Sequence, residues 1–188
     1  MNGKIYLFSA KARHGKDSAC TYFKKLLEDN NKKVVHTLYA KYLKQYAKEY
    51  FGWDGREETK PRELLQVLGT DIIRKELNKP NFHVNRICED IEILSKYFDA
   101  FLISDCRFRN EVLVPREKFG DRVVAIRIIR TNYTSNLTIE QQQHESETAL
   151  DNFKDWDYII KAENLDELYR QLDDIYLLEE CNEENNLY

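Results

Sequence analysis

Residues 4–18 read KIYLFSAKARHGKDS, an apolar run followed by a turn of small and basic residues. The run combines β-branched and aromatic residues, which predicts a buried strand, and the apolar residues between 19 and 27 recur at the spacing of one helix face. Between the two stands Gly15-Lys16. A glycine there lets backbone N–H groups turn toward an anion, and the lysine reaches its outer phosphates. The stretch therefore predicts a phosphate-binding loop at the start of a helix.

The loop departs from the pattern G-x-x-x-x-G-K-[ST] at two positions. Ala10 stands in place of the first glycine, and Asp17 stands where the pattern has a magnesium-binding hydroxyl, with Ser18 one residue later. A short glycine and lysine pattern is a weak signal alone, and an ordinary turn between strand and helix is the alternative. The context of strand, loop and helix favours phosphate binding.

The composition predicts one soluble domain spanning residues 1–188. The chain has 42% hydrophobic and 33% charged residues, which is enough for one well-packed core. Its net charge of −4 argues against nucleic acid as a partner, because a phosphate backbone attracts a basic surface. We find no segment that resembles a signal peptide and no run of about 18 apolar residues, so we expect a cytoplasmic protein without a membrane partner.

The four cysteines are predicted to be reduced thiols. They are widely scattered and form no C-x-x-C pair, a distribution that does not favour disulfides or zinc. They are Cys20, Cys88, Cys106 and Cys181.

Strand patterns alternate with helix patterns along the chain, which predicts an α/β fold: a five-stranded parallel sheet with helices on both faces. The polar stretch 131–147 is interpreted as a mobile flap with a helix inside it. Beyond the helix at 165–178 we expect an acidic tail. The other predicted strands are 33–38, 99–105, 122–130 and 156–160, and the other predicted helices are 39–51, 62–69, 72–77 and 84–97.

Charged residues stand where two predicted strands end. Asp105 closes one apolar strand, and Arg130 closes another that also carries Arg127. Ligands of open α/β sheets bind outside the carboxyl ends of the strands, and the phosphate loop lies on that same edge. We therefore expect these residues to face a ligand.

Three further motifs accompany the G-K-D-S of residues 15–18: KPRELLQVLGTD at 60–71, ISDCRFRNE at 103–111 and HESE at 144–147. Their order resembles the phage-type deoxynucleoside monophosphate kinases, a branch of the P-loop nucleoside monophosphate kinases. The resemblance implies a three-layer P-loop NTPase fold with a nucleoside monophosphate-binding insertion at about 39–97 and a lid at about 131–150. Two positions depart from the family, which commonly has glycine at Ala10 and proline at Arg109.

The resemblance also implies an activity, the transfer of the γ-phosphoryl group of MgATP to a deoxynucleoside monophosphate. Joining two phosphates brings negative charges together, which the protein must neutralise. Catalytic roles then fall to Lys16, Arg107, Arg130 and Asp105, the last as a partner of magnesium-bound water or of a substrate hydroxyl. Either Asp17 or Ser18 would serve the Mg²⁺ of MgATP. The predicted ATP-binding residues are Ala10, Lys11, Ala12, Arg13, His14, Gly15, Lys16, Asp17 and Ser18.

Candidate acceptor-binding residues lie within the three further motifs. Arg62 and Gln66 are four residues apart and share one helix face, which suits an arginine on the acceptor phosphate and an amide on its base. Asp71, Arg107 and His144 complete the set. For Gln66 the alternative is a solvated helix face, and for His144 it is packing or helix capping.

Two other functions stay open on the sequence. A phosphomevalonate-type kinase also has a phosphate acceptor, so the loop and the arginines do not separate it. A catalytically silent nucleotide-binding protein would fit the departures at Ala10 and Asp17. ATP and the acceptor are the expected partners, and a homodimer through the segment from Leu165 to Tyr188 is a weaker expectation.

Overall fold

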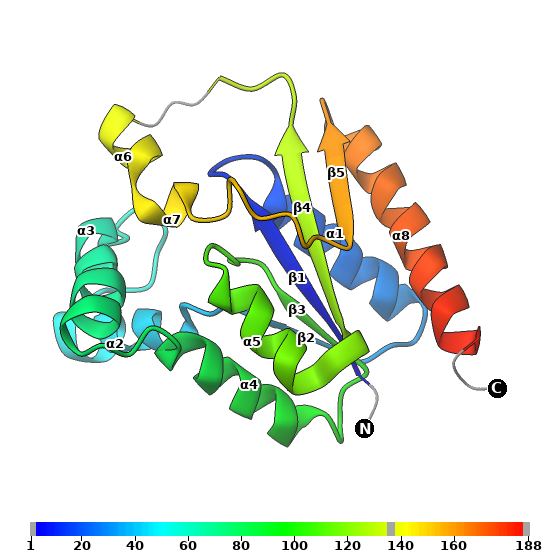
Figure 1. The fold of residues 1–188 in the computed structure, drawn as a ribbon, viewed down its shortest axis with the longest axis horizontal. Coiled ribbons are helices and arrows are strands. Elements are labelled where there is room, and N and C mark those ends of the chain that lie inside the picture. Colours follow the sequence, from blue (N-terminus) through cyan, green and yellow to red (C-terminus); the bar gives the residue numbers. More distant parts are fainter. Residues whose placement is uncertain (1–2, 135–137, 186–188) are drawn as a thin grey trace.

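The computed structural model describes residues 3–134 and 138–185. Five parallel strands form one sheet in the order β2-β3-β1-β4-β5 (Figure 1). This confirms the predicted five-stranded parallel sheet. The strands are β1 (Lys4–Ala10), β2 (Val34–Thr37), β3 (Ala100–Ile103), β4 (Val123–Arg130) and β5 (Tyr158–Ala162).

Helices cover both faces of the sheet, because alternate strand residues point to opposite sides. Tyr6 and Phe8 belong to one buried cluster, which also contains residues of α1 (Lys16–Asp29) and α8 (Leu165–Asn185). Ile5 and Leu7 belong to the other cluster. It contains residues of α4 (Phe82–Leu94) and α5 (Asn110–Phe119). The predicted three layers are thus present.

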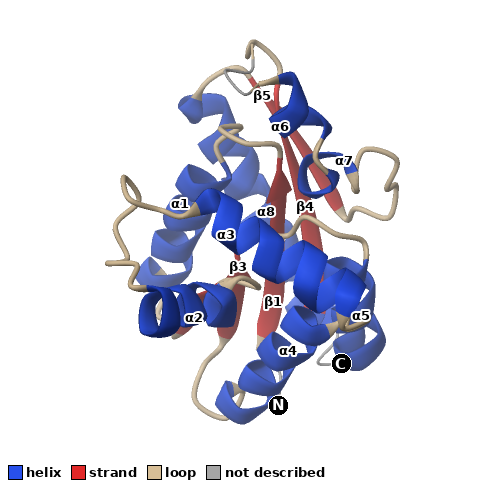
Figure 2. Ribbon diagram, turned by 90° about the vertical axis from the view of Figure 1, so that its left-hand side faces the viewer, coloured by secondary structure: helices blue, strands red, loops and turns tan. Residues whose placement is uncertain are grey.

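A helical insertion connects β2 to β3. It contains α2 (Lys41–Phe51), α3 (Arg62–Gln66), the π-helix η1 (Val67–Glu76) and α4. Figure 2 shows α3 and η1 as one continuous helical run beside α2.

The predicted break after Gly69 is therefore wrong. Gly69 is buried inside η1, and a Cβ atom added there would lie 2.9 Å from Cδ2 of Leu43 on α2. A missing side chain, rather than a helix end, explains this glycine, because it lets α2 approach closely.

Helix α5 was not predicted from the sequence. It contains Pro115, which lacks the N–H that an interior helical residue donates. Its buried face also includes the carboxylate residue Glu111, so the apolar signal is weak. Helix α8 was predicted too short, since it continues past Leu178 to Asn185.

The polar stretch after β4 contains two short helices, α6 (Ile139–Gln143) and α7 (Glu145–Thr148). Residues 135–137 of this predicted flap lie outside the described part of the chain. In Figure 1, α7 lies beside the phosphate loop at the carboxyl end of β1.

The cysteines are free thiols, and three of them, Cys20, Cys88 and Cys106, are buried. Cys181 is exposed on α8. Among the described helices we find none that combines the length and the apolar character needed to cross a bilayer.

Candidate active site

The predicted phosphate loop connects the end of β1 to the start of α1. Gly15, the residue before the helix, has φ 89°, a left-handed conformation that L side chains rarely adopt. Arg13 also has a positive φ of 62°. These two turns bend the backbone between Ala10 and Lys16, where the free N–H groups of the helix N-terminus favour an anion.

Lys16 is the first residue of α1, and its side chain is only 14% exposed. Its Nζ lies 3.6 Å from Oδ2 of Asp17, whose side chain is 82% exposed. The lysine side chain is therefore largely buried, while the aspartate side chain projects toward solvent.

Two carboxylates of the segment between β4 and β5, hereafter the flap region, contact the loop. Oε2 of Glu147 accepts a hydrogen bond of 2.9 Å from the backbone N–H of Ala12. Lys11 donates to Oδ2 of Asp151 over 2.9 Å. Neither acidic residue was singled out from the sequence as a partner of the loop, because no local pattern indicates a contact across 135 or 140 positions.

Arg107 also contacts the carboxylate of Glu147. Its Nη1 lies 2.6 Å from Oε1 of Glu147, and the guanidinium side chain is 35% exposed. Arg109, the other arginine of this motif, is exposed. Of the two arginines, Arg107 therefore lies against the loop side of the site.

A buried carboxylate holds the turn that carries Arg107. Oε2 of Glu111 accepts from the backbone N–H groups of Arg107 and Phe108, and its Oε1 accepts from Arg74 over 2.7 Å. Burial raises the pKa of Glu111 to about 7, which the Arg74 charge and the two N–H groups oppose. This residue fixes the backbone of the turn.

Asp105 anchors the insertion to the sheet edge. Its two carboxylate oxygens accept from the backbone N–H groups of Tyr39, at 2.7 Å, and Ala40, at 3.0 Å, immediately before α2. The ion pair of Arg107 is with Glu147 rather than with Asp105. A magnesium or hydroxyl role for Asp105 stays a prediction.

The end of β4 is connected to the phosphate loop. The backbone N–H of Arg130 donates to Nδ1 of His14 over 3.1 Å, while the exposed Arg130 guanidinium lies 5.3 Å from the ring centre of Tyr133. Burial, with the nearby cations Arg127, Lys11 and Arg130, lowers the pKa of His14. The transferring-group role of Arg130 stays a prediction.

Arg127 lies deeper. Its Nη1 donates to the hydroxyl of Ser9 over 2.8 Å, and its Nη2 lies 3.7 Å from Asp151. A cavity of about 330 Å³ lies beside this arginine and the loop. Its lining includes Lys11, His14, Arg127, Asp151, Phe153 and Trp156.

The other predicted acceptor residues are at the surface. Arg62 and Gln66 are exposed on α3, and Arg62 pairs with Glu57 over 2.8 Å. Asp71 pairs with Lys75 over 3.0 Å.

His144 is the N-cap of α7. Its Nδ1 accepts from the backbone N–H of Ser146 over 3.2 Å. Helix capping by His144 is therefore confirmed, while its role in acceptor binding stays a prediction.

Lys44 of α2 also lies close to the site, although no sequence motif singled it out. It is half-buried on α2, and burial, followed by the charge of Lys60, lowers its pKa. Asp105 and Asp17 oppose that shift, which places the ammonium group in the field of both carboxylates. Helical spacing alone does not distinguish such a lysine from its exposed neighbours.

The donor set suits a magnesium ion that arrives with a nucleotide. Asp17 and Asp105 both act electrostatically on His36 and on Lys44, raising their pKa values against the effect of burial. Within residues 3–134 and 138–185 no group of three or more His, Cys, Asp or Glu residues could hold a metal. Mg²⁺ commonly uses one or two carboxylates together with substrate phosphates, so these carboxylates fit it.

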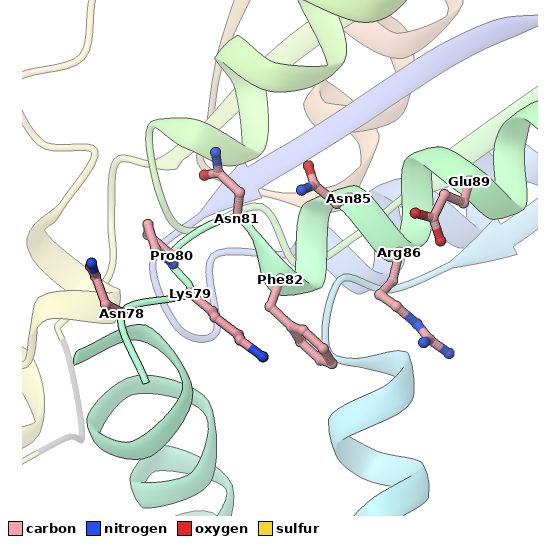
Figure 3. A pocket seen from close by; sticks show the side chains of 8 residues that line it. All are labelled: Asn78, Lys79, Pro80, Asn81, Phe82, Asn85, Arg86 and Glu89. Carbon is pink, nitrogen blue, oxygen red and sulfur yellow. The ribbon is translucent and has the colours of Figure 1, made fainter. Parts of the chain in front are cut away.

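Another cavity, of about 390 Å³, lies at the start of α4 (Figure 3). In Figure 3 the side chains of Lys79, Phe82 and Arg86 project to the same side of the helix. Its lining residues lie between 78 and 89 and include none of the predicted site residues.

Comparisons with known proteins support the motif assignment. No family model matches the chain. A curated protein of Acanthamoeba polyphaga mimivirus, named "Putative deoxynucleotide monophosphate kinase", is 29% identical over 121 residues. The predicted family resemblance is confirmed by this relative. The match covers 60% of this chain and 58% of the relative, so the chain spans less than two thirds of that protein's length.

Among solved structures, the APS kinase CysC of Mycobacterium tuberculosis, as its Cys556Ala mutant, is similar to this chain with a TM-score of 0.49 and 14% identity. The similarity covers 95% of this chain and 98% of that chain.

Proposed function

We propose that the chain is a deoxynucleoside monophosphate kinase, which transfers the γ-phosphoryl group of MgATP to a deoxynucleoside monophosphate and releases ADP. The four ordered motifs support this proposal, as does the mimiviral relative named for that activity.

One observation carries the proposal. A single carboxylate, that of Glu147, contacts both the N–H of Ala12 in the phosphate loop and the guanidinium of Arg107. The loop and the arginine therefore converge on one anionic group. This is the arrangement that a reaction between two phosphates requires, because the donor and acceptor groups must lie within bonding reach of each other.

The proposed mechanism depends on charge and position. Lys16 and the loop N–H groups hold the outer phosphates of ATP, Arg107 binds the acceptor phosphate, and Arg130 stabilises the transferring group. Mg²⁺, held with Asp17 or Ser18, would neutralise phosphate charge when bound. The phosphate of a monophosphate has a second pKa of about 6 and is already an anion at neutral pH, so the acceptor needs no general base.

The remaining predicted residues would recognise the acceptor from the insertion and the lid. In the proposal Arg62 and Asp71 approach the acceptor phosphate and sugar, and Gln66 contacts the base. These side chains are exposed on α3 and η1, so the proposal requires the insertion to move toward the loop when the acceptor binds.

A coupled ADP-release assay tests this function. The acceptors are the deoxynucleoside monophosphates, the ribonucleoside monophosphates and phosphomevalonate. We expect the highest kcat/KM with a deoxynucleoside monophosphate. A preference for phosphomevalonate would assign the other kinase activity, and ATP binding without turnover of any acceptor would assign a silent nucleotide-binding protein.

A further inference from the structure

We propose that Glu147, together with Asp151, is a built-in substitute for nucleotide phosphate. It occupies the phosphate loop in the nucleotide-free protein and is displaced when a polyphosphate binds. The inference rests on the proposed function only in assuming that this loop binds a nucleotide polyphosphate.

The contacts of Glu147 are those of a bound anion. One carboxylate oxygen accepts from a loop N–H and the other from Arg107, and the side chain is only 10% exposed. A carboxylate and a phosphate present the same features to such donors, a negative charge and oxygen acceptors. Glu147 therefore occupies donors that a phosphate oxygen would use.

Asp151 supports this interpretation from an adjacent position. It contacts Lys11 at 2.9 Å, the loop residue next to Ala12, and it lies 3.7 Å from Arg127. The flap region thus supplies two negative charges to a loop that also contains Arg13 and Lys16.

A polyphosphate and Glu147 exclude each other. Both are anions, and like charges that share one set of donors repel strongly in a partly buried site. When ATP fills the loop, Glu147 must leave, and Arg107 then loses its 2.6 Å partner. The donor site and the acceptor arginine are coupled in this way, since filling the first frees the second.

The test compares three full-length variants with the wild-type protein. Glu147→Gln keeps the shape of the side chain and removes its charge. Asp151→Asn makes the same change at the more exposed contact. The matched control is Glu145→Gln, because Glu145 is an exposed glutamate on the same helix α7.

The probes are inorganic tripolyphosphate and a non-hydrolysable ATP analogue, with affinity measured by calorimetry. We expect Glu147→Gln to bind both about tenfold more tightly, because a charged competitor for the loop is gone. Asp151→Asn should change affinity in the same direction by a smaller factor, and Glu145→Gln should match the wild-type protein. In the wild-type protein, tripolyphosphate should also accelerate hydrogen exchange in residues 138–151.

Unchanged or weaker affinity in Glu147→Gln would overturn the proposal, since Glu147 would then position Arg107 or stabilise the loop. Unchanged exchange in residues 138–151 would overturn displacement, and so would the absence of tripolyphosphate binding in both proteins. None of these measurements uses turnover. A failed acceptor screen would therefore refute the kinase assignment and leave this result standing.

Discussion

The sheet that carries the phosphate loop and the helical insertion that faces it differ in how much they bury. Along β1 every side chain from Ile5 to Ala10 is buried, and all four residues of β3 are buried. By contrast, α3 contains no buried residue, and η1 buries only Gly69, Thr70 and Ile73. Within the insertion, α3 and η1 are therefore attached to the core by far less apolar surface than α4, which belongs to the core cluster.

This difference separates the two halves of the proposed site. Local opening costs least where few apolar contacts are buried, so α3 and η1 are the part of the insertion that is expected to move. The donor loop lies on the rigid sheet edge, while Arg62 and Gln66 lie on the lightly buried helix. A fixed donor site and a movable acceptor site suit a reaction that must exclude water once both substrates are bound.

Two carboxylates join the halves. Asp105 binds the backbone in front of α2, and Glu111 binds Arg74 of η1. Both carboxylates follow β3 in the chain, so these contacts tie the start of α2 and η1 to the segment that follows a strand of the sheet.

The largest effect is expected from the rigid half. Lys16→Ala should lower kcat by about 10²–10³-fold, because one fixed positive donor to the phosphates is lost. The melting temperature should change little, since the ion pair of Lys16 within the described part of the chain is with the exposed Asp17. Steady-state kinetics and thermal unfolding check this, with Lys25→Ala at an exposed position of α1 as the control. Near-native turnover would refute the phosphate loop.

The next prediction concerns the boundary between the halves. Arg107→Lys should lower kcat/KM for the acceptor about tenfold to a hundredfold, because a lysine does not reproduce the planar fork on a phosphate. The KM for ATP should stay nearly constant. Arg109→Lys is the matched control, since Arg109 is exposed two residues away. Loss of ATP affinity with retained acceptor affinity would move Arg107 to the donor side.

The sequence predicted the rigid half better than the other half, for a physical reason. Buried parallel strands are continuous apolar runs, and the Gly15-Lys16 turn has a local sequence pattern. The sheet and the loop could therefore be predicted from the sequence. A π-helix has no such pattern. Gly69 was therefore interpreted as a helix end, although its packing against Leu43 explains it.

The contacts of the site were less predictable than its location. The motifs predicted that Arg107 lies near the loop, but they did not predict its ion pair with Glu147, which is 40 residues away in the sequence. Asp105 was recognised as a strand-end carboxylate, yet its bonds to the N–H groups of Tyr39 and Ala40 depend on how the insertion folds back. Contacts between residues so far apart in the sequence can be identified only from the three-dimensional structure.

A smaller effect is expected inside the insertion, at His83 on α4. This ring is buried, and neither of its nitrogens has a hydrogen-bond partner among the described residues. The backbone of Gly69 nevertheless opposes the shift of its pKa. Burial, followed by the Arg74 charge, lowers the pKa of His83 from 6.5 to about 4. Replacing it by leucine should raise the free energy of unfolding by about 1 kcal/mol at neutral pH, because an unsatisfied polar group is removed.

The stability difference between His83→Leu and the wild-type protein is expected to depend on pH. As pH falls from 6.5 to about 4, the unfolded chain binds a proton at His83 that the folded chain refuses, so the wild-type protein loses stability there. His83→Leu has no such loss, and its advantage should grow between pH 7 and pH 5. Urea titrations at both pH values check this. A constant or negative difference would show that the ring has a polar partner.

The smallest effect should come from Gly69→Ala, and it tests the comparison directly. Alanine favours a helix interior over glycine by about 1 kcal/mol. The added Cβ would stand 2.9 Å from Cδ2 of Leu43, but that atom is the end of a rotatable side chain on a lightly anchored helix. We therefore expect a change in unfolding free energy within about 1 kcal/mol, since the two terms offset each other.

Gly15→Ala is the matched substitution on the rigid half. There φ is 89°, so alanine should cost about 1–2 kcal/mol whatever space surrounds it. Urea unfolding of the two variants side by side separates the cases. If Gly69→Ala proved as costly as Gly15→Ala, Leu43 would be unable to yield, and α2 would be held against η1 as firmly as the loop is held by the sheet. The acceptor half would then be expected to move without any change in the contact between α2 and η1.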